Sequence, residues 1–335
     1  MGEIIVIGAG SWGTALAQLI CSNPSVDSRV ILCSNSEQEV ADLIKAGENR
    51  RSFPGIKLNP RLEYALMDKT SLENAAMIVF SAPSRATREI VRNLKIPKQT
   101  VLLNTAKGIE AGSLKRMSEV LFEEQGNQER IASLSGPSFA LEVVKGLPTA
   151  VTIAGSSQKT LDYCVSVFHQ SNFRVYTSSD LVGVEMGGVV KNVIALAAGM
   201  LDGAGMGNNA RAGMITRGMM EMQELCVALG AQKETIYGLS GLGDLLLTAT
   251  GDLSRNRTLG LRFGKGEKLE QILSDLGQVA EAATSTGYIV ELAKRYSLVL
   301  PIIFEVDKVL KGERMVTESI KTLLSRKQSK EFESQ

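Results

Sequence analysis

The first half of the chain alternates short apolar runs with segments of helical periodicity. Short runs rich in β-branched residues are typical of buried strands, whereas apolar residues three and four positions apart are typical of amphipathic helices. Strands are expected at residues 4–7, 30–33, 77–81, 101–104, 131–134, 149–153 and 174–176. Helices are expected to begin near Thr14, Glu37, Arg85, Ser113 and Gln158. This alternation predicts βαβ units and a doubly wound, mostly parallel sheet.

The pattern changes at about Leu181, where strand signals almost vanish. Helical periods occupy residues 182–201, 211–229, 256–263, 268–276, 280–295 and 301–311, and the polar tail from Ser325 is expected to be frayed. A chain of 335 residues is longer than one hydrophobic core usually supports. The sequence therefore predicts an α/β domain over residues 1–180 and an all-α domain over residues 181–335.

Charge and cysteine content narrow the class of protein. Thirty-seven basic and 36 acidic residues give a net charge of +1, and no basic stripe is present, so nucleic-acid binding is not expected. Cys21, Cys33, Cys164 and Cys226 stand far apart, without a C-x-x-C pair, and are expected to be buried or free thiols rather than metal ligands. Without a signal peptide or an unbroken apolar stretch of about eighteen residues, the protein is expected to be cytoplasmic and to have no membrane span.

Lys191 is the charged residue that most needs an explanation, because it lies in the middle of a strongly apolar helical segment. It shares a helix face with small and apolar residues, namely Gly187, Gly188, Ile194, Ala195 and Ala198. Either the side chain extends along the helix to water, or it is buried and available for proton transfer. The single histidine, His169, is expected at a helix C-terminus in a structural role, which leaves acid–base chemistry to a lysine or a carboxylate.

The N-terminal segment contains a glycine-rich loop between a predicted strand and a predicted helix. Gly8, Gly10 and Gly13 fit G-x-G-x-x-G, in which the glycines permit a tight turn, close approach of a pyrophosphate and close packing of the helix on the strand. The strand and helix on either side predict a Rossmann-type dinucleotide site. A similar spacing at residues 205–210 follows a helix, and it is expected to be a flexible turn.

The end of the second predicted strand bears on the choice of cofactor. An acid at this position hydrogen-bonds the ribose 2′-hydroxyl of NAD, whereas an arginine accommodates the 2′-phosphate of NADP. This chain has Ser34 and Asn35 there, and its first acid, Glu37, is already at the start of a helix. The preference between NADH and NADPH therefore stays open.

Three further segments have polar residues suited to a phosphorylated substrate. Lys107 and the pair Gly136 and Ser138 follow predicted strands, at the sheet edge where open α/β folds bind ligands. Asp244 supplies a carboxylate, and Ser254 with Arg255 begins a helix whose N–H groups could bind phosphate. Taken alone, Ser254 is an ordinary N-cap and Arg255 an ordinary solvated side chain.

Together these segments closely resemble the bacterial-type NAD(P)-dependent glycerol-3-phosphate dehydrogenase family. The matching motifs span nearly the whole chain: GAGSWG at 8–13, KGIE at 107–110, SGPS at 135–138, LPTA at 147–150, FRVY at 173–176, VKNVIA at 190–195, GLGD at 241–244 and SRNR at 254–257. The resemblance implies that the enzyme interconverts dihydroxyacetone phosphate and sn-glycerol 3-phosphate with NAD(P)H, supplies glycerol 3-phosphate for glycerophospholipid synthesis, and forms a homodimer.

The resemblance also implies roles for individual residues. Lys191 is the expected proton donor and acceptor, Lys107 stabilises the alkoxide, and Asp244 orients Lys191. The expected substrate-binding residues are Lys107, Gly136, Ser138, Lys191, Asp244, Ser254, Arg255 and Asn256. The expected cofactor-binding residues are Gly8, Gly10, Ser11, Trp12, Gly13, Ser34, Asn35, Lys107, Ala140, Arg255, Val279 and Glu281. The chain departs from the family at residues 33–35, where an aromatic residue followed by His or Arg is usual.

Two other functions share parts of this pattern. A β-hydroxyacid dehydrogenase also has a nucleotide domain, a helical domain and a catalytic lysine, but it binds a carboxylate, and the segment 254–257 argues against it. A nicotinamide-sensing regulator would have no need for Lys191, Lys107 and Asp244 together.

Overall fold

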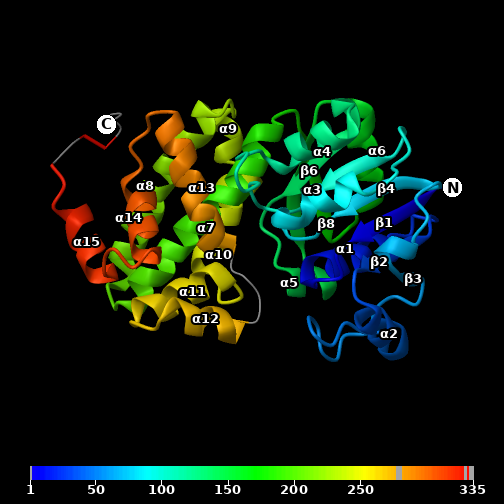
Figure 1. Ribbon diagram of the computed structural model, residues 1–335, viewed down its shortest axis with the longest axis horizontal. Helices are drawn as coiled ribbons and strands as arrows, with labels where there is room; N and C mark the ends of the chain where they lie inside the picture. Colours follow the sequence, from blue (N-terminus) through cyan, green and yellow to red (C-terminus); the bar gives the residue numbers. More distant parts are fainter. Residues whose placement is uncertain (1, 277–280, 328–329, 332–335) are drawn as a thin grey trace. The chain divides into compact units, whose positions relative to one another are not determined.

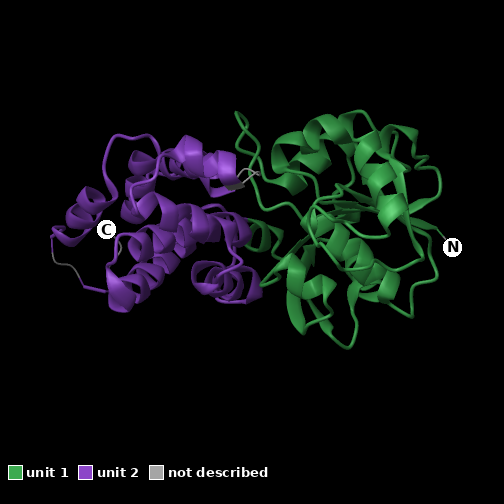
Figure 2. Ribbon diagram, turned by 90° about the horizontal axis from the view of Figure 1, so that it is seen from below, with its two compact units in different colours: residues 1–185 green, residues 186–335 purple. Residues whose placement is uncertain are grey.

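The computed structural model describes residues 2–276, 281–327 and 330–331. The chain divides into two compact units, Met1–Glu185 and Met186–Gln335, which Figure 2 draws in green and purple. The division falls within one long helix, α7 (Leu181–Gly203).

Unit 1 is built on an eight-stranded sheet with the order β3-β2-β1-β4-β5-β6-β7-β8 (Figure 1). The strands are β1 (Glu3–Ile7), β2 (Val30–Ser34), β3 (Leu62–Leu66), β4 (Ala75–Phe80), β5 (Val101–Asn104), β6 (Ile131–Ser135), β7 (Thr149–Gly155) and β8 (Phe173–Ser178). Every neighbouring pair is parallel except β6 and β7, in which Ser133 lies opposite Ala154. The strand order reverses between β1 and β4, and the carboxyl ends of strands at such a reversal form the usual ligand-binding edge of these folds.

Helices cover both faces of this sheet. They are α1 (Ser11–Ser22), α2 (Glu37–Ala46), α3 (Ser84–Arg92), α4 (Met117–Gln125), α5 (Ala140–Val144) and α6 (Gln158–Phe168), with short 3-10 turns η1 (Met67–Lys69) and η2 (Gln128–Arg130). Alternate residues of β1 belong to two apolar clusters, Ile4 and Val6 to one and Ile5 and Ile7 to the other. A strand buried on both faces needs this continuous apolar sequence.

Unit 2 consists of helices. After α7 they are α8 (Gly207–Ala228), α9 (Lys233–Ile236), the π-helical turn η3 (Leu239–Gly243), α10 (Asp244–Thr250), α11 (Arg255–Gly264), α12 (Leu269–Leu276), α13 (Glu281–Arg295), α14 (Pro301–Leu310) and α15 (Val316–Leu324). By length and composition α7 could cross a membrane, contrary to the expectation from the sequence. Its most apolar window is 94% buried inside the protein, as in the core helix of a globular domain.

The fold class predicted from the sequence, a mostly parallel Rossmann-type sheet followed by a helical domain, is confirmed. The pattern missed β3, because this edge strand is only partly buried and includes the charged Glu63. It also missed the short helices α5, α9, α10 and α15. The segment 205–210 is a turn only up to Met206, since α8 begins at Gly207. Part of the tail expected to fray lies outside the described residues.

Candidate active site

The glycine-rich loop of unit 1 joins β1 to the N-terminus of α1, and its glycines have different environments. Gly8 has a φ of +110°, and a Cβ there would lie 2.9 Å from the Ala82 nitrogen. A Cβ on Gly13 would lie 2.0 Å from the Gly8 carbonyl oxygen, so the helix packs directly on the turn. Gly10 faces open space, with no atom within 4 Å of a Cβ built there. The loop therefore has room for a pyrophosphate at Gly10 and at the start of α1.

Two other side chains shape this loop. Asn49, which the sequence pattern did not single out, is buried and donates hydrogen bonds to the Ala9 carbonyl oxygen and the Thr14 hydroxyl, both at 2.9 Å. The Trp12 Nε1 is a buried donor for which the described part of the chain provides no acceptor. A buried donor without a partner is unfavourable, and a bound dinucleotide could supply the acceptor. This donor and the open space at Gly10 fit a dinucleotide.

A carboxylate of α2 that the sequence did not single out binds the tip of β2. The Ser34 hydroxyl donates a hydrogen bond to the Glu39 carboxylate and accepts one from the Ser36 N–H at 3.1 Å. Ser36 is the N-cap of α2 and accepts from the Glu39 N–H at 3.2 Å. The sequence S-x-x-E at residues 36–39 is the usual signature of such a cap. Asn35, between these residues, is exposed.

Three of the expected substrate-binding residues lie together in unit 1. The Lys107 amine donates to the Gly136 carbonyl oxygen at 3.2 Å, and the Ser138 hydroxyl donates to the same oxygen at 3.0 Å. Gly136 has a φ of +143°, and a Cβ there would lie 2.9 Å from Val151 Cα, so no larger residue fits this turn. The loops after β5 and β6 thus meet at the carboxyl edge of the sheet. Ala140, expected to contact the cofactor, begins α5.

Lys191 is buried in unit 2 and does not extend to water. It is 6% exposed, and its amine donates to Asp244 Oδ1 at 3.0 Å and to the Thr248 hydroxyl at 2.7 Å. The Thr248 hydroxyl in turn donates to the Asp244 carbonyl oxygen at 2.6 Å. The carboxylate favours the charged amine, which offsets part of the penalty of its burial. Thr248 was missed, although the D-x-x-x-T spacing places it on the same helix face as Asp244.

A tightly packed turn brings Asp244 to this position. Asp244 begins α10 directly after the π-helical turn η3, a type of distortion that is frequent at functional sites. A Cβ on Gly241 would lie 2.0 Å from the Ile236 carbonyl oxygen, and one on Gly187 of α7 would lie 2.9 Å from the Ser240 carbonyl oxygen. The glycines permit this turn to pack against α7 so closely that Asp244 reaches Lys191.

Glycines also fix α11 against α7. A Cβ on Gly199 would lie 2.1 Å from the Arg257 carbonyl oxygen, and one on Gly260 would lie 2.1 Å from the Leu196 carbonyl oxygen. Gly203 and Gly264 make the same kind of approach one turn further along. Small residues four apart on both helices permit this backbone contact. The start of α11 is thereby held at a fixed distance from the helix that contains Lys191.

The start of α11 contains the segment expected to bind phosphate. The Ser254 hydroxyl caps the helix by accepting from the Arg257 N–H at 3.2 Å, and Arg255 is exposed. The Arg257 guanidinium forms an ion pair within unit 2, because it donates to Asp202 at 3.1 and 2.8 Å. Of the two arginines in this segment, Arg255 is therefore the one at the surface.

Two asparagines connect α11 with α7 and α13. Asn256 donates to Asn192 Oδ1 at 2.9 Å and accepts from the Ala282 N–H at 3.2 Å, while Asn192 donates to Glu281 at 3.5 Å. Asn256 and Glu281, both expected in the site, are thus joined through Asn192, which adjoins Lys191 and was not predicted. Val279, an expected cofactor contact, lies outside the described residues.

The remaining candidates are the single histidine, which lies at a helix end, and the four buried cysteines. His169 caps the C-terminus of α6, and its Nδ1 accepts from the Val175 N–H at 3.2 Å. The four cysteines are buried and unpaired with one another, and burial raises the pKa of Cys21 to about 11 and that of Cys164 to about 12. Within residues 2–276, 281–327 and 330–331, no cluster of three or more His, Cys, Asp or Glu side chains could hold a metal ion.

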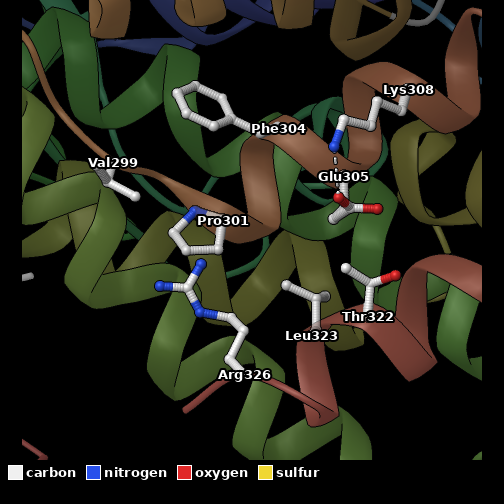
Figure 3. A pocket seen from close by; sticks show the side chains of 8 residues that line it. All are labelled: Val299, Pro301, Phe304, Glu305, Lys308, Thr322, Leu323 and Arg326. Carbon is white, nitrogen blue, oxygen red and sulfur yellow. Dashed lines mark hydrogen bonds and ion pairs between the residues drawn. The ribbon is translucent and has the colours of Figure 1, made fainter. Parts of the chain in front are cut away.

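A cavity of about 150 Å³ opens at α14 and α15 of unit 2 (Figure 3). Its lining includes Phe304, Leu323 and the Glu305 carboxylate, which pairs with Lys308 at 2.9 Å. Arg314 also binds Glu305, at 2.7 Å. None of the expected site residues lines this cavity.

Comparison with known proteins identifies the family of the chain. Models of the N-terminal and C-terminal parts of NAD-dependent glycerol-3-phosphate dehydrogenase match residues 3–161 and 180–321. The chain belongs to this family. The resemblance inferred from the motifs, and with it the expectation of an NAD(P)-dependent dehydrogenase, is confirmed.

Relatives in this dehydrogenase family match along almost their entire length. The glycerol-3-phosphate dehydrogenase (NAD(P)+) of Moorella thermoacetica is 44% identical over 334 residues, which cover 99% of this chain and 98% of the relative. That of Stenotrophomonas maltophilia is 42% identical, with 98% and 96% covered. The crystal structure of glycerol-3-phosphate dehydrogenase from Coxiella burnetii has a TM-score of 0.91 at 36% identity and covers 97% of this chain and 99% of that one. D-mandelate dehydrogenase, 14% identical with a TM-score of 0.59, shares the fold alone.

Proposed function

We propose that this member of the glycerol-3-phosphate dehydrogenase family interconverts dihydroxyacetone phosphate and sn-glycerol 3-phosphate with NAD(P)H as the hydride donor or NAD(P)+ as the acceptor. The observation that supports it most is the buried Lys191 amine, held by Asp244 and Thr248. In this proposal residues 1–180 form the dinucleotide-binding domain and residues 181–335 the substrate-binding domain.

The glycine-rich loop would hold the dinucleotide. Gly10 and the N-terminus of α1 would face its pyrophosphate, and Trp12 would find an acceptor for its Nε1 donor. When bound, the nicotinamide supplies the hydride for the carbonyl carbon. The residues of this chain then have to bind, orient and protonate the substrate.

Lys191 would act as the proton donor in reduction and as the base in oxidation. A general acid must be in reach of the oxygen it protonates and must be held in one orientation. Asp244 and the Thr248 hydroxyl hold the ammonium in a defined orientation, as proton transfer to a substrate oxygen requires. Lys107 would add a second positive charge that stabilises the developing alkoxide.

The start of α11 would bind the phosphate. It offers backbone N–H groups, the surface guanidinium of Arg255 and the side chain of Asn256, a combination that suits a dianion. A substrate with only a carboxylate would use fewer of these donors. This argues for the triose phosphate over the β-hydroxyacid alternative.

The family and the composition support a proposal for the place of the enzyme in the cell. We propose a cytoplasmic homodimer that supplies glycerol 3-phosphate for glycerophospholipid synthesis. Apolar side chains of α7 and α8 such as Ala198, Met219 and Met222 are buried within the chain and give no separate support for a dimer. The homodimer is therefore proposed from the family alone.

One assay tests the function. The purified protein is mixed with NADH or NADPH and either dihydroxyacetone phosphate or a panel of β-ketoacids, and the loss of absorbance of the reduced cofactor is followed. We expect turnover with the triose phosphate and little with the ketoacids. Turnover only with the ketoacids would assign the protein to the alternative class, and binding of the cofactor without any turnover would favour a sensor.

A further inference from the structure

A buried carboxylate with no part in the proposed chemistry lies behind the loop that contains Lys107. Glu185, the last residue of unit 1, is 7% exposed. Its Oε1 accepts from the Ser118 N–H at 2.9 Å, the Ser133 hydroxyl at 2.8 Å and the Asn104 amide at 3.2 Å. Its Oε2 accepts from Arg116 at 2.8 Å and from the Ser118 hydroxyl at 2.6 Å. A carboxylate removed from water requires such a set of donors.

These donors come from both ends of one connection. Asn104 is the last residue of β5, and Arg116 and Ser118 lie at the beginning of α4. The segment between them, residues 105–115, contains Lys107. The negative charge also lies at the N-terminus of α4, where the helix dipole stabilises it. One side chain therefore fixes the start and the end of the segment that contains Lys107.

Asn104 transmits this constraint to the residue before Lys107. Its Oδ1 accepts from the Ala106 N–H at 3.0 Å, and its Nδ2 donates to the Ala106 carbonyl oxygen at 3.1 Å. Because Glu185 accepts hydrogen bonds only, it requires the Nδ2 group on its own side and leaves Oδ1 for the Ala106 N–H. With Ala106 held at both polar groups, the direction of the next residue, Lys107, is fixed.

Glu185 holds the other loop of this site as well. Ser133 is in β6, and the Gly136 carbonyl oxygen that binds the Lys107 amine follows the same strand. The two loops whose side chains and backbone meet at Lys107 are thus joined behind it through a single carboxylate.

We propose that Glu185 is a positioning residue for Lys107: by bonding Asn104, Ser133, Arg116 and Ser118 together, it sets the orientation in which the Lys107 amine meets substrate. The consequence for turnover rests on the proposed function of the chain, whereas the effect on the loop does not.

Hydrogen exchange tests the effect on the loop without any turnover. In Glu185→Gln only one of the two side-chain oxygens remains as an acceptor, so the donors of Asn104, Ser118, Ser133 and Arg116 can no longer all be satisfied and the hold on Asn104 is weakened. We expect the Ala106 amide to exchange at least about tenfold faster, with strands β1 and β2 unchanged. Asn104→Ala should produce the same local effect even where Glu185→Gln folds poorly. Unchanged exchange at Ala106 in a folded variant of either kind would overturn the proposal, whether or not the triose phosphate assay succeeds.

A double-mutant cycle tests the link to Lys107. Glu185→Gln should lower kcat by about tenfold in the wild-type background and by less than about twofold when Lys107 is already Ala, because its effect acts through that amine. An equal loss in both backgrounds would indicate general destabilisation and would overturn the proposal.

Glu221→Gln serves as the matched control. Glu221 is also a buried carboxylate that accepts backbone N–H bonds, from Ile302 and Ile303, but it belongs to unit 2 and bonds none of the residues that bind Glu185. It should leave kcat and the exchange of Ala106 unchanged. Intrinsic fluorescence of Trp12, the single tryptophan, gives the Kd for NADH in every variant and should be nearly constant in Glu185→Gln.

Discussion

Lys107 in unit 1 and Lys191 in unit 2 are the same kind of side chain in opposite surroundings. Lys107 follows a strand, is partly exposed, and donates to a neutral carbonyl oxygen of Gly136. Lys191 lies in the middle of a helix, is almost entirely buried, and donates to the carboxylate of Asp244. An amine in a dry site with an anionic partner has a defined orientation and a strong interaction with its surroundings.

The two environments fit the different tasks proposed for the two lysines. A positioned, buried amine suits proton transfer, which demands one geometry and one proton. A partly solvated amine on a loop suits electrostatic stabilisation, in which its charge matters more than its protons. The architecture agrees with this division, because Lys191 is held by packed helices whereas Lys107 depends on hydrogen bonds at the ends of strands.

The largest expected effect comes from Lys191→Ala. Loss of the proton donor should lower kcat by about 1,000-fold, within the range of about 10²–10⁴ typical of general acid catalysis. The Kd for NADH, measured through Trp12 fluorescence, should stay within about twofold, because the loop proposed to bind the dinucleotide belongs to unit 1. A folded variant with near-normal turnover would show that another group supplies the proton.

The Lys191→Ala experiment needs a control for a loss of stability. Asp244 is 1% exposed, and without the amine its buried charge has lost its cation, which is strongly destabilising. Asp244→Asn in the Lys191→Ala background removes that charge. We expect the double variant to regain thermal stability without regaining activity.

A smaller loss is expected from Lys107→Ala, about 100-fold in kcat, as for removal of a single donor that stabilises an oxyanion. Lys107→Arg should recover part of it, because the charge is retained. The same substitution at Lys191 should recover nothing, because a guanidinium does not release its proton at neutral pH. Recovery by arginine at both positions, or at neither, would remove the distinction between the two lysines.

Much of this contrast could be predicted from the sequence. Lys191 is conspicuous because apolar residues surround it in the sequence, although the periodicity of the helix left open whether its amine is buried or reaches water. The partner Asp244 was proposed from the family, but its place at the start of α10 was not foreseen, because α10 is short and follows an irregular π-helical turn. Short elements have too few residues to show a periodicity.

The hydrogen bonds around the Lys107 loop were harder to predict from the sequence. Asn104 and Glu185 are 81 residues apart in the sequence, and nothing in the local pattern connects them. Glu39 was overlooked for another reason, since it lies in the first turn of α2 and reads as a capping residue. Hydrogen bonds between residues far apart in the sequence depend on the tertiary fold. The hydrophobic periodicity of the sequence predicts single helices and strands, but not which distant residues meet.

Acid–base behaviour should also separate the two units. Burial raises the pKa of Glu221 in unit 2 to about 7, although the N–H groups of Ile302 and Ile303 oppose the shift. In unit 1, hydrogen bonds from Arg92 and Arg88 lower the pKa of Glu124 to about 2. The first group binds its proton more tightly in the folded state, and the second releases it more easily.

The signs of the two contributions to stability therefore differ. Glu221 stabilises the fold most below pH 4.5, and this contribution of about 3 kcal/mol is lost as the pH rises through about 7. Glu124 contributes above pH 4.5 and loses its contribution only as the pH falls toward 2. Between pH 5 and 8 the thermal stability should fall, and Glu221→Gln should flatten this dependence. A wild-type profile that rises over this interval would contradict the assignment.

Arg255→Ala tests the phosphate site of unit 2, with an expected rise of about tenfold in KM for dihydroxyacetone phosphate through loss of a charge-assisted bond. Unphosphorylated dihydroxyacetone should be almost unaffected. Arg257→Ala is the matched control, since Arg257 binds Asp202 and its removal should lower the melting temperature more than it changes KM. An equal loss for both substrates in Arg255→Ala would mean that this arginine does not bind the phosphate.

The smallest effect is expected at the cofactor end of unit 1. Both NADH and NADPH should support turnover, with kcat/KM values less than about 100-fold apart. The tip of β2 has no arginine to bind a 2′-phosphate, and the nearby carboxylate of Glu39 in α2 is engaged with Ser34. Asn35→Asp adds an unengaged carboxylate at an exposed position and should shift the ratio of Kd values toward NADH by about fivefold. Glu39→Gln should shift the ratio of Kd values slightly toward NADPH.

Trp12 fluorescence reports the Kd values for NADH and NADPH without turnover, and neither variant should alter KM for the triose phosphate. If both variants leave the ratio unchanged, the 2′ end must be read elsewhere, and Arg50, which pairs with Glu48 at 2.6 Å in the loop after α2, would be the next residue to replace.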